Sequence, residues 1–301
     1  MMSETTEQRC GTVAIVGRPN VGKSTLLNRL IGQKLAITSH KAQTTRHSIL
    51  GIKTRTEGQI LFVDTPGIHR RGGSALNRYL NRAARTAIGD TDVALFVVEA
   101  LRWTEEDSTA LEAIRGAGVP AIAVVNKIDR VANKQDLLPY LHQLGQRHAF
   151  LEIFPVSASR GDQVDALEDA LVRALPLGEP LFAEDQITDR SERFFAAELV
   201  REQLVQRYGE ELPYCTSVEI ERFEEQDGRY LINALIWVER PSQKAIIIGR
   251  QGEALKAAAT QARLEMQKLF DRPVHLEVWV KVKKSWSSDE SALGSLGYGD
   301  A

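Results

Sequence analysis

Residues 17–25, "GRPNVGKST", are the most informative segment of the first half of the chain. It fits the pattern G-x-x-x-x-G-K-[ST] between an apolar run and a segment of helical period, which is the context that a phosphate-binding loop requires. Glycines at both ends let the backbone wrap around phosphates, Lys23 adds positive charge, and Ser24 offers a hydroxyl ligand for Mg²⁺. The predicted phosphate-contacting residues are Gly17, Arg18, Pro19, Asn20, Val21, Gly22, Lys23, Ser24 and Thr25.

Outward from this loop, short apolar runs alternate with segments of helical period as far as residue 175. The predicted strands are 11–16, 60–67, 93–100, 121–129 and 150–159. The predicted helices are 23–32, 75–89, 105–117, 134–147 and 163–175. This alternation indicates an α/β domain with a mostly parallel sheet covered by helices, and ligands then bind at the carboxyl ends of the strands.

Length and composition limit the class of protein. A chain of 301 residues that is 43% hydrophobic favours two domains. The net charge of −2 gives no general attraction to nucleic acid or to an anionic membrane, so such a partner needs a local patch. Two cysteines, Cys10 and Cys215, are too few for a disulfide framework and favour a reducing compartment. We expect a soluble protein without a signal peptide, a membrane span or a zinc site.

Three further motifs follow predicted strands and turn a phosphate loop into a nucleotide site. Asp64 in "DTPG" can hold Mg²⁺ through a water, and the Gly67 amide can meet a terminal phosphate. In "NKID", residues 126–129, Asp129 can accept two hydrogen bonds from guanine, whereas adenine offers no such pair of donors. The backbone of "SAS", residues 157–159, can meet the guanine carbonyl. These contacts add Asp64, Thr65, Pro66, Gly67, Ile68, Asn126, Lys127, Asp129, Ser157 and Ala158 to the predicted GTP site.

These motifs resemble those of a known protein family. Residues 11–175 are similar to the GTPase domain of translation-factor-like GTPases, and "KAQTTRH", residues 41–47, resembles the first switch of the bacterial Era GTPases. The resemblance implies binding of GTP and GDP with Mg²⁺, and it makes Thr45, with Thr44 as second choice, the switch ligand of that Mg²⁺. The predicted Mg²⁺ ligands are then Ser24, Thr45 and, through a water, Asp64. The predicted catalytic residues are Lys23, Thr45, Asp64 and Gly67. The resemblance to this family extends to the end of the chain, although Ser285 stands where the family pattern has glycine.

Two positions bear on hydrolysis. Many GTPases carry a glutamine after the "DTPG" glycine to orient the attacking water, and this chain has Ile68 there, which predicts slow intrinsic hydrolysis. Related GTPases with "PNVGKS" use the asparagine to hold K⁺, which would supply charge in the transition state. Asn20 could instead fix the loop by hydrogen bonding, since asparagine commonly bonds its own backbone in turns. Both interpretations of Asn20 stay open.

The order α-β-β-α-α-β over residues 191–284, around "GRQG", resembles a type II KH domain, whose G-x-x-G loop clamps single-stranded RNA. Residues 241–284 carry nine Lys or Arg against four Asp or Glu, which suits a contact with an RNA backbone. The apolar run before the loop can be core or the wall of an RNA groove. Lys281 and Lys283 share a strand face that is either solvated or in contact with RNA. The predicted RNA contacts are Ile247, Ile248, Gly249, Arg250, Gln251, Gly252 and Lys256.

The predicted organisation is a flexible N-terminus (1–10), a GTPase domain (11–175), a linker (176–190), a KH-type domain (191–284) and a polar tail (285–301). The resemblance implies a GTP-hydrolysing RNA-binding switch in small ribosomal subunit assembly, which binds 16S rRNA near its 3′ end and the 30S subunit. It also implies a cytoplasmic monomer with a peripheral inner-membrane fraction. One alternative is a nucleotide-gated RNA-binding scaffold with incidental turnover. An RNA-dependent ATPase is a weaker alternative, because Asp129 argues against it.

Overall fold

The computed structural model describes residues 8–39, 41, 44–67, 75–209, 212–284 and 286. The chain divides into two compact units. Unit 1 comprises Met1–Ala36, Thr45–Gly72 and Leu80–Asp189, and unit 2 comprises Ile37–Thr44, Gly73–Tyr79 and Arg190–Ala301. Two short pieces from the first third of the chain therefore group with its C-terminal part.

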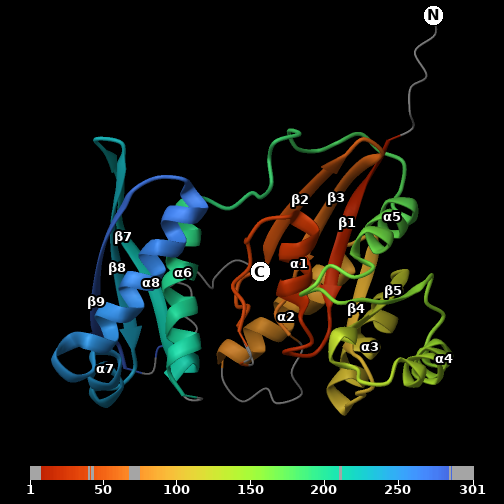
Figure 1. Ribbon diagram of the computed structural model, residues 1–301, viewed down its shortest axis with the longest axis horizontal. Helices are drawn as coiled ribbons and strands as arrows, with labels where there is room; N and C mark the ends of the chain where they lie inside the picture. The colour runs from red at the N-terminus through yellow and green to blue at the C-terminus, as the bar shows by residue number, and fades with distance from the viewer. Residues whose placement is uncertain are drawn as a thin grey trace, which may run out of the picture. The chain divides into compact units, whose positions relative to one another are not determined.

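Unit 1 contains a six-stranded sheet in the order β2-β3-β1-β4-β5-β6 (Figure 1). Every neighbouring pair is parallel except β2 and β3. The strands are β1 (Arg9–Val16), β2 (Ile49–Arg55), β3 (Gly58–Asp64), β4 (Val93–Glu99), β5 (Ala121–Asn126) and β6 (Ile153–Pro155). The predicted α/β class with a mostly parallel sheet is confirmed, and the parallel strands present their carboxyl ends at one edge.

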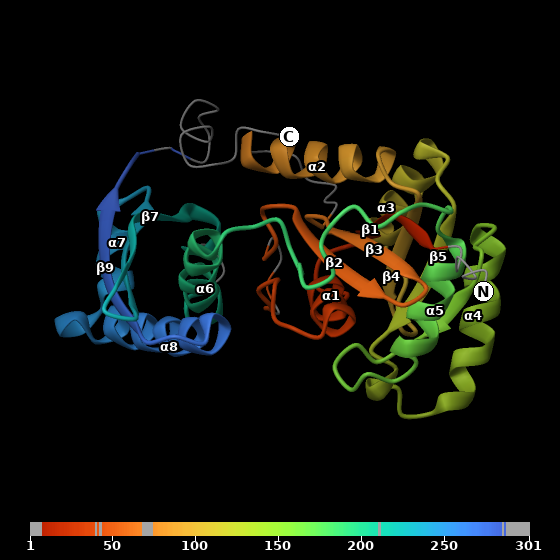
Figure 2. The ribbon, with the colours of Figure 1, turned by 90° about the horizontal axis from the view of Figure 1, so that it is seen from above.

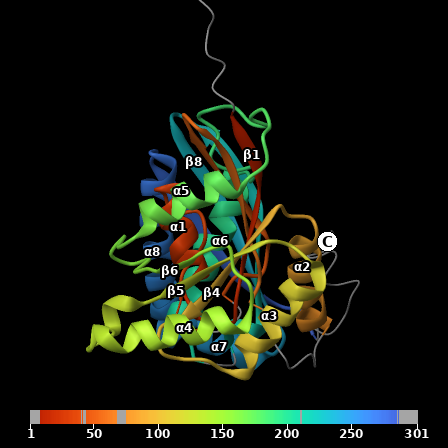
Figure 3. The same cartoon turned by 90° about the vertical axis from the view of Figure 1, so that its right-hand side faces the viewer.

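Helices cover both faces of this sheet. They are α1 (Lys23–Ile31), α2 (Ala75–Gly89), α3 (Glu105–Ala117), α4 (Leu137–Arg147) and α5 (Val164–Ala174). Buried residues of α2, α3 and α4 share one apolar cluster with β1, β4 and β5. Helices α1 and α5 lie together on the other face (Figures 2 and 3). Because both faces are covered, most residues of the central strands are buried, which explains their continuous apolar runs.

Strand β2 was not predicted from the sequence. It pairs antiparallel with β3, from Ile49 opposite Asp64 to Arg55 opposite Gly58. As the edge strand, β2 has only partly buried residues from Lys53 to Arg55, so it lacks the long apolar run of its neighbours. The predicted strand 150–159 is also too long, because β6 has three residues.

The segment after α5 is hydrogen-bonded to unit 1. The side-chain oxygen of Gln59 accepts from the amides of Leu181 and Phe182, at 2.8 and 3.0 Å. Ile52 donates its amide to the carbonyl of Ile187 at 2.8 Å. Residues predicted as a linker therefore run along the hairpin formed by β2 and β3.

Unit 2 has the predicted order α-β-β-α-α-β. Its elements are α6 (Glu192–Arg207), β7 (Thr216–Gln226), β8 (Arg229–Val238), α7 (Pro241–Ile248), α8 (Glu253–Phe270) and β9 (Val274–Val282). The sheet order is β7-β8-β9, with β7 antiparallel and β9 parallel to β8. Helices α6 and α8 pack together against the sheet (Figure 1). No helix among the described residues is long and apolar enough to cross a bilayer.

Candidate functional site

The loop between β1 and α1 needs glycine at both ends. Gly17 and Gly22 have φ angles of 157° and 101°. A Cβ at Gly17 would lie 2.3 Å from the carbonyl oxygen of Val97, and one at Gly22 would lie 2.3 Å from the side-chain nitrogen of Asn126. Gly22 is also the N-cap of α1, so the positive end of the helix dipole faces the loop. This geometry is that of an anion-binding loop.

Lys23 folds back over this loop. Its Nζ donates to the carbonyls of Gly17 and Arg18 at 3.0 and 3.1 Å, and the residue is 6% exposed. Burial lowers the pKa of Lys23 to about 8, against a smaller opposing effect of Asp64. A phosphate at the loop would offer this buried cation an anionic partner, which raises the affinity of the loop for phosphate.

Asp64, Ser24 and Thr45 meet at the carboxyl end of β3. The Ser24 hydroxyl donates to Asp64 Oδ2 at 3.0 Å and the Thr45 hydroxyl does so at 3.2 Å, and the two hydroxyls lie 3.0 Å apart. Asp64 is fully buried, and its Oδ1 has no hydrogen-bond partner among the described residues. Burial raises the pKa of Asp64 to about 6. One carboxylate and two hydroxyls form an oxygen donor set that fits Mg²⁺.

The two candidate switch threonines differ in their hydrogen-bond partners. The Thr44 hydroxyl donates to the carbonyl of Lys41 at 2.7 Å, and only Thr45 reaches Asp64. Thr65 lies in the same region but bonds the backbone of β1, at Ile15. A Cβ at Gly67 would lie 2.9 Å from the Pro19 ring, so the "DTPG" turn lies against the phosphate loop. Ile68 lies outside the described residues.

Asn126 ties the base-recognition motif to the loops on either side of it. Its Nδ2 donates to the carbonyl of Val21 at 2.8 Å. Its Oδ1 accepts from the amides of Lys127 and Ala158, at 2.8 and 3.0 Å. Asn126 is 2% exposed and therefore holds its neighbours in place from the interior.

Asp129 lies beside the "SAS" loop at the surface. The Ser157 hydroxyl donates to Asp129 Oδ1 at 2.7 Å, and this hydrogen bond holds the pKa of Asp129 below its ordinary value. The carboxylate is therefore charged at neutral pH and can accept from a base edge. Lys127 has a positive φ of 66° and donates to the carbonyl of Asn20 at 2.6 Å.

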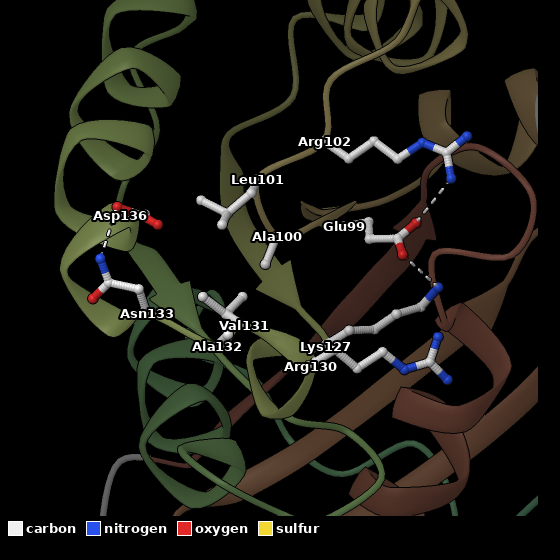
Figure 4. A pocket seen from close by; sticks show the side chains of 10 residues that line it. All are labelled: Glu99, Ala100, Leu101, Arg102, Lys127, Arg130, Val131, Ala132, Asn133 and Asp136. Carbon is white, nitrogen blue, oxygen red and sulfur yellow. Dashed lines mark hydrogen bonds and ion pairs between the residues drawn. The ribbon is translucent and has the colours of Figure 1, made fainter.

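Two cavities adjoin this motif. One of about 430 Å³ is bounded by the turn after β4 and by residues after β5, with Lys127 at its side (Figure 4). The other, of about 360 Å³, lies between the end of α1 and the loop at Ala158 and Ser159. The phosphate and base motifs therefore converge on one edge of the sheet, as the sequence predicts.

Asn20 has a positive φ of 65° and an exposed side chain. Its backbone carbonyl accepts from Lys127, but among the described contacts its side chain makes none. This geometry leaves the choice between K⁺ coordination and loop fixation open.

Two carboxylates near the loop were missed from the sequence. The guanidinium of Arg18 pairs with Glu99 at 2.8 Å and with Asp107 at 3.1 Å. Asp107 is the last residue of "TEED", an N-terminal capping pattern that could have located the start of α3 but not this pairing.

The segment that precedes Thr45 belongs to unit 2 and contacts α6 there. The amide of Thr38 donates to Glu202 at 3.0 Å, Lys41 donates to the carbonyls of Val205 and Tyr208, and Arg201 donates to the carbonyl of Thr44. No sequence pattern pointed to this arrangement.

The "GRQG" turn of unit 2 connects α7 to α8. Gly249, Gln251 and Gly252 have φ angles of 70°, 53° and 80°. A Cβ at Gly249 would lie 2.6 Å from that of Ala254, so glycine is required for the close approach of α8. Arg250 is exposed at the turn, where its charge is available to a phosphate.

The isoleucines before this turn differ in exposure. Ile247 is fully buried, so core packing describes it, whereas Ile248 is half-buried. Ile246, not singled out from the sequence, is 53% exposed. Lys256 is exposed on α8, one turn after the "GRQG" turn.

Lys281 of β9 and Lys283, which directly follows that strand, contact other side chains of the sheet. Lys281 pairs with Glu221 at 3.3 Å. Lys281 and Lys283 each lie 5.9 Å from the Trp237 ring. These contacts leave open whether the lysines also reach RNA.

Comparison with known proteins gives matches over both units. Residues 12–127 match a family of 50S ribosome-binding GTPases, and residues 211–287 match the KH domain. The GTPase Era of Pseudomonas aeruginosa is 57% identical over 293 residues, which cover 97% of this chain and 96% of that protein.

Two solved structures are similar over the same length. One is a variant of Aquifex aeolicus Era bound to GDP and AlF₄⁻, and the other is Era in complex with MgGDPNP and nucleotides 1506–1542 of 16S ribosomal RNA. Each has a TM-score of 0.93, is 39% identical, and covers 97% of this chain and 99% of its own.

Proposed function

This chain belongs to the Era family of GTPases, and from that premise we propose that it is a GTP-hydrolysing, RNA-binding switch in the assembly of the small ribosomal subunit. One observation carries the proposal: Ser24, Thr45 and Asp64 converge at the end of β3 in a chain that also has a KH domain. A switch residue at the phosphate site and an RNA-binding module on the same chain provide the parts that a GTP-controlled RNA contact needs.

The residues of unit 1 have separate roles in this proposal. Backbone amides of residues 17–25 and the Lys23 ammonium bind the phosphates, and Asp129 selects guanine. Ser24, Thr45 and Asp64 would hold Mg²⁺, which when bound offsets charge on the terminal phosphates. The Gly67 amide meets the terminal phosphate. Since the Ile68 side chain has no group that can hydrogen-bond the attacking water, we expect slow intrinsic hydrolysis.

The RNA contact is assigned to the "GRQG" turn and its flanks. Arg250 and Lys256 are exposed cations that can pair with RNA phosphates, and glycine lets the backbone approach them. Ile248 contributes apolar surface for bases. The partner in this proposal is 16S rRNA near its 3′ end within the 30S subunit, supported by the Era complex with nucleotides 1506–1542.

Cellular location and assembly state rest on the family resemblance. We place the protein in the cytoplasm as a monomer, with a fraction in peripheral contact with the inner membrane. Sedimentation of cell extracts, with and without high salt, tests the membrane fraction, because a peripheral contact is released by salt.

Asn20 decides the proposed K⁺ requirement. If its side-chain oxygen coordinates K⁺, hydrolysis runs faster in K⁺ than in Na⁺ at equal ionic strength, because the cation stabilises charge that develops in the transition state. Asn20→Ala then removes the difference while nucleotide affinity persists. Equal rates of the unaltered protein in both salts would show that Asn20 only fixes the loop.

The central test measures GTP turnover of the full chain with and without an RNA of nucleotides 1506–1542. Stimulation by this RNA, and none by an RNA of the same length and composition in shuffled order, supports the switch. Specific RNA binding without stimulation supports the scaffold with incidental turnover. Absence of binding to this RNA would exclude the assigned partner.

A further inference from the structure

The side chain of Arg18 links the phosphate loop to two other elements. Arg18 is 5% exposed although it lies in the loop. Its Nη2 lies 2.8 Å from Glu99 Oε2, at the end of β4, and its Nε lies 3.1 Å from Asp107 Oδ2, in the first turn of α3. A buried guanidinium with two carboxylate partners is a strong and directional connection.

Glu99 also reaches the base-recognition motif. Its second oxygen, Oε1, lies 3.2 Å from Lys127 Nζ, and Figure 4 shows this carboxylate between Lys127 and the more exposed Arg102. Burial raises the pKa of Glu99, but hydrogen bonds from Arg18 and Lys127 outweigh that effect, and its pKa lies below the ordinary value. One carboxylate therefore bridges a cation of the phosphate loop and a cation of the guanine motif.

The Asp107 carboxylate contacts both the N-cap of α3 and Arg18. Its Oδ2 accepts from the amide and the hydroxyl of Thr104, each at 2.8 Å, and also from Arg18. The side chain is fully buried, and its Oδ1 has no hydrogen-bond partner among the described residues. A fully buried carboxylate is costly without a cation, and Arg18 provides that cation.

We propose that Glu99 and Asp107 are positioning residues for nucleotide binding, which hold the phosphate loop in register with the guanine motif through Arg18 and Lys127. Phosphate and base are then bound by one connected group of residues. Loss of the Glu99 or Asp107 carboxylate then weakens the binding of phosphate and of base together. The inference rests on the proposed GTP site and adds residues to it that touch no nucleotide.

The test measures the dissociation of fluorescently labelled GDP from the full-length protein. Glu99→Gln keeps the shape of the side chain and removes the charge that joins the two cations. We expect dissociation to be about tenfold faster, because a hydrogen bond to a charged group is worth that much or more. Asp107→Asn should act in the same direction.

A second readout separates positioning from general stability. Inosine diphosphate lacks the guanine amino group, so the ratio of GDP to IDP affinity reports the register of the base. In Glu99→Gln this ratio should fall by about threefold, because the base motif has lost its connection to the loop. A residue that only stabilises the fold would lower the melting temperature and leave this ratio unchanged.

Two control variants lie in α3 and at its N-cap. Glu112→Gln removes the same charge from an exposed pair with Arg115 and should keep the original dissociation rate. Thr104→Ala removes the cap but leaves the Arg18 contact, so it should lower the melting temperature and retain the GDP to IDP ratio. An unchanged rate and ratio in Glu99→Gln, or the same change of ratio in Thr104→Ala, would overturn the inference. Failure of the unaltered protein to bind GDP would instead contradict the proposed function.

Discussion

At the scale of single residues, the proposed phosphate site is built from buried charged groups. Lys23 and Asp64 have opposite charges and opposite pKa shifts, and burial is the main cause of both. Asp129 differs, because it lies near the surface and a hydroxyl keeps it ionised. The charged groups proposed to meet phosphate and metal are thus strongly desolvated by the protein, whereas the group proposed to meet the base is much less so.

Asp64 makes the contribution of Mg²⁺ to nucleotide binding dependent on pH. Its pKa is raised from 3.8 to about 6, so the carboxyl gains a proton as the pH falls through about 6. Metal binding needs the ionised form, so the gain in GDP affinity from Mg²⁺ should fall about tenfold per pH unit below this value. Titrations of fluorescent GDP between pH 5 and 8 measure this. Affinity without Mg²⁺ is the control, and the same pH dependence in Asp64→Asn would contradict the assignment.

Asp129 is expected to determine base specificity. Asp129→Asn replaces a double acceptor by a group that also donates, so it should weaken GTP binding and improve binding of xanthosine triphosphate. The loss of discrimination should be on the order of 10⁴-fold, since a site that leaves polar groups unpaired rejects its ligand strongly. Competition with labelled GDP measures both affinities, and an unchanged GTP affinity would remove Asp129 from base recognition.

At the scale of elements, loops at strand and helix ends carry the chemistry. In unit 1 they follow β1, β3, β5 and β6, and the parallel order brings them to one edge. In unit 2, the "GRQG" turn joins α7 to α8 with positive φ angles at three of its positions. In both units, a short loop with positive φ angles therefore connects two regular elements.

The "GRQG" turn can be tested apart from the nucleotide site. Replacing Arg250 and Gln251 by aspartate puts negative charge where RNA phosphates would lie, and it should reduce RNA affinity by at least about tenfold. GTP affinity should persist, because the nucleotide motifs lie in unit 1. Electrophoretic or anisotropy assays at near-physiological salt measure RNA binding. RNA affinity that survives both substitutions would exclude the turn as the RNA contact.

At the scale of the whole molecule, the predicted first switch is divided between the two units. Its residues up to Thr44 group with unit 2, and those from Thr45 onward group with unit 1. Thr44 is held by Arg201 of α6, and the next residue, Thr45, bonds Ser24 and Asp64. A nucleotide that changes the position of Thr45 therefore acts on a segment whose preceding residues contact α6. The peptide chain from Thr45 to the segment that contacts α6 is then sufficient to couple nucleotide binding to RNA binding.

This coupling predicts that RNA affinity differs between the GTP-analogue and GDP states by about fivefold or more, and that RNA changes nucleotide affinity by the same factor. Lys41→Ala removes two hydrogen bonds from the switch segment, one to α6 and one to Tyr208 at its C-cap. It should reduce the difference without altering RNA affinity in the GDP state. Anisotropy titrations in both nucleotide states measure this, and equal RNA affinities in the unaltered protein would rule out coupling.

The sequence alone determined the class of the fold and the motifs of the nucleotide site. Local patterns are sufficient there: a glycine-rich loop between a strand and a helix, and polar residues directly after apolar runs. Helices α2 and α3 begin and end where the pattern predicts. The edge strand β2 escaped prediction, because an edge strand shows a weaker apolar pattern than a buried one.

Contacts between distant residues came from the tertiary structure alone. The Thr45 hydroxyl reaches Asp64, nineteen positions away, whereas the Thr44 hydroxyl bonds the carbonyl of Lys41. Ile247 is core rather than groove wall because other elements cover it. The pairing of Arg18 with Asp107 spans 89 positions, and no local pattern specifies it. Contacts of this kind arise when parallel strands bring their ends together, so sequence spacing does not reveal them.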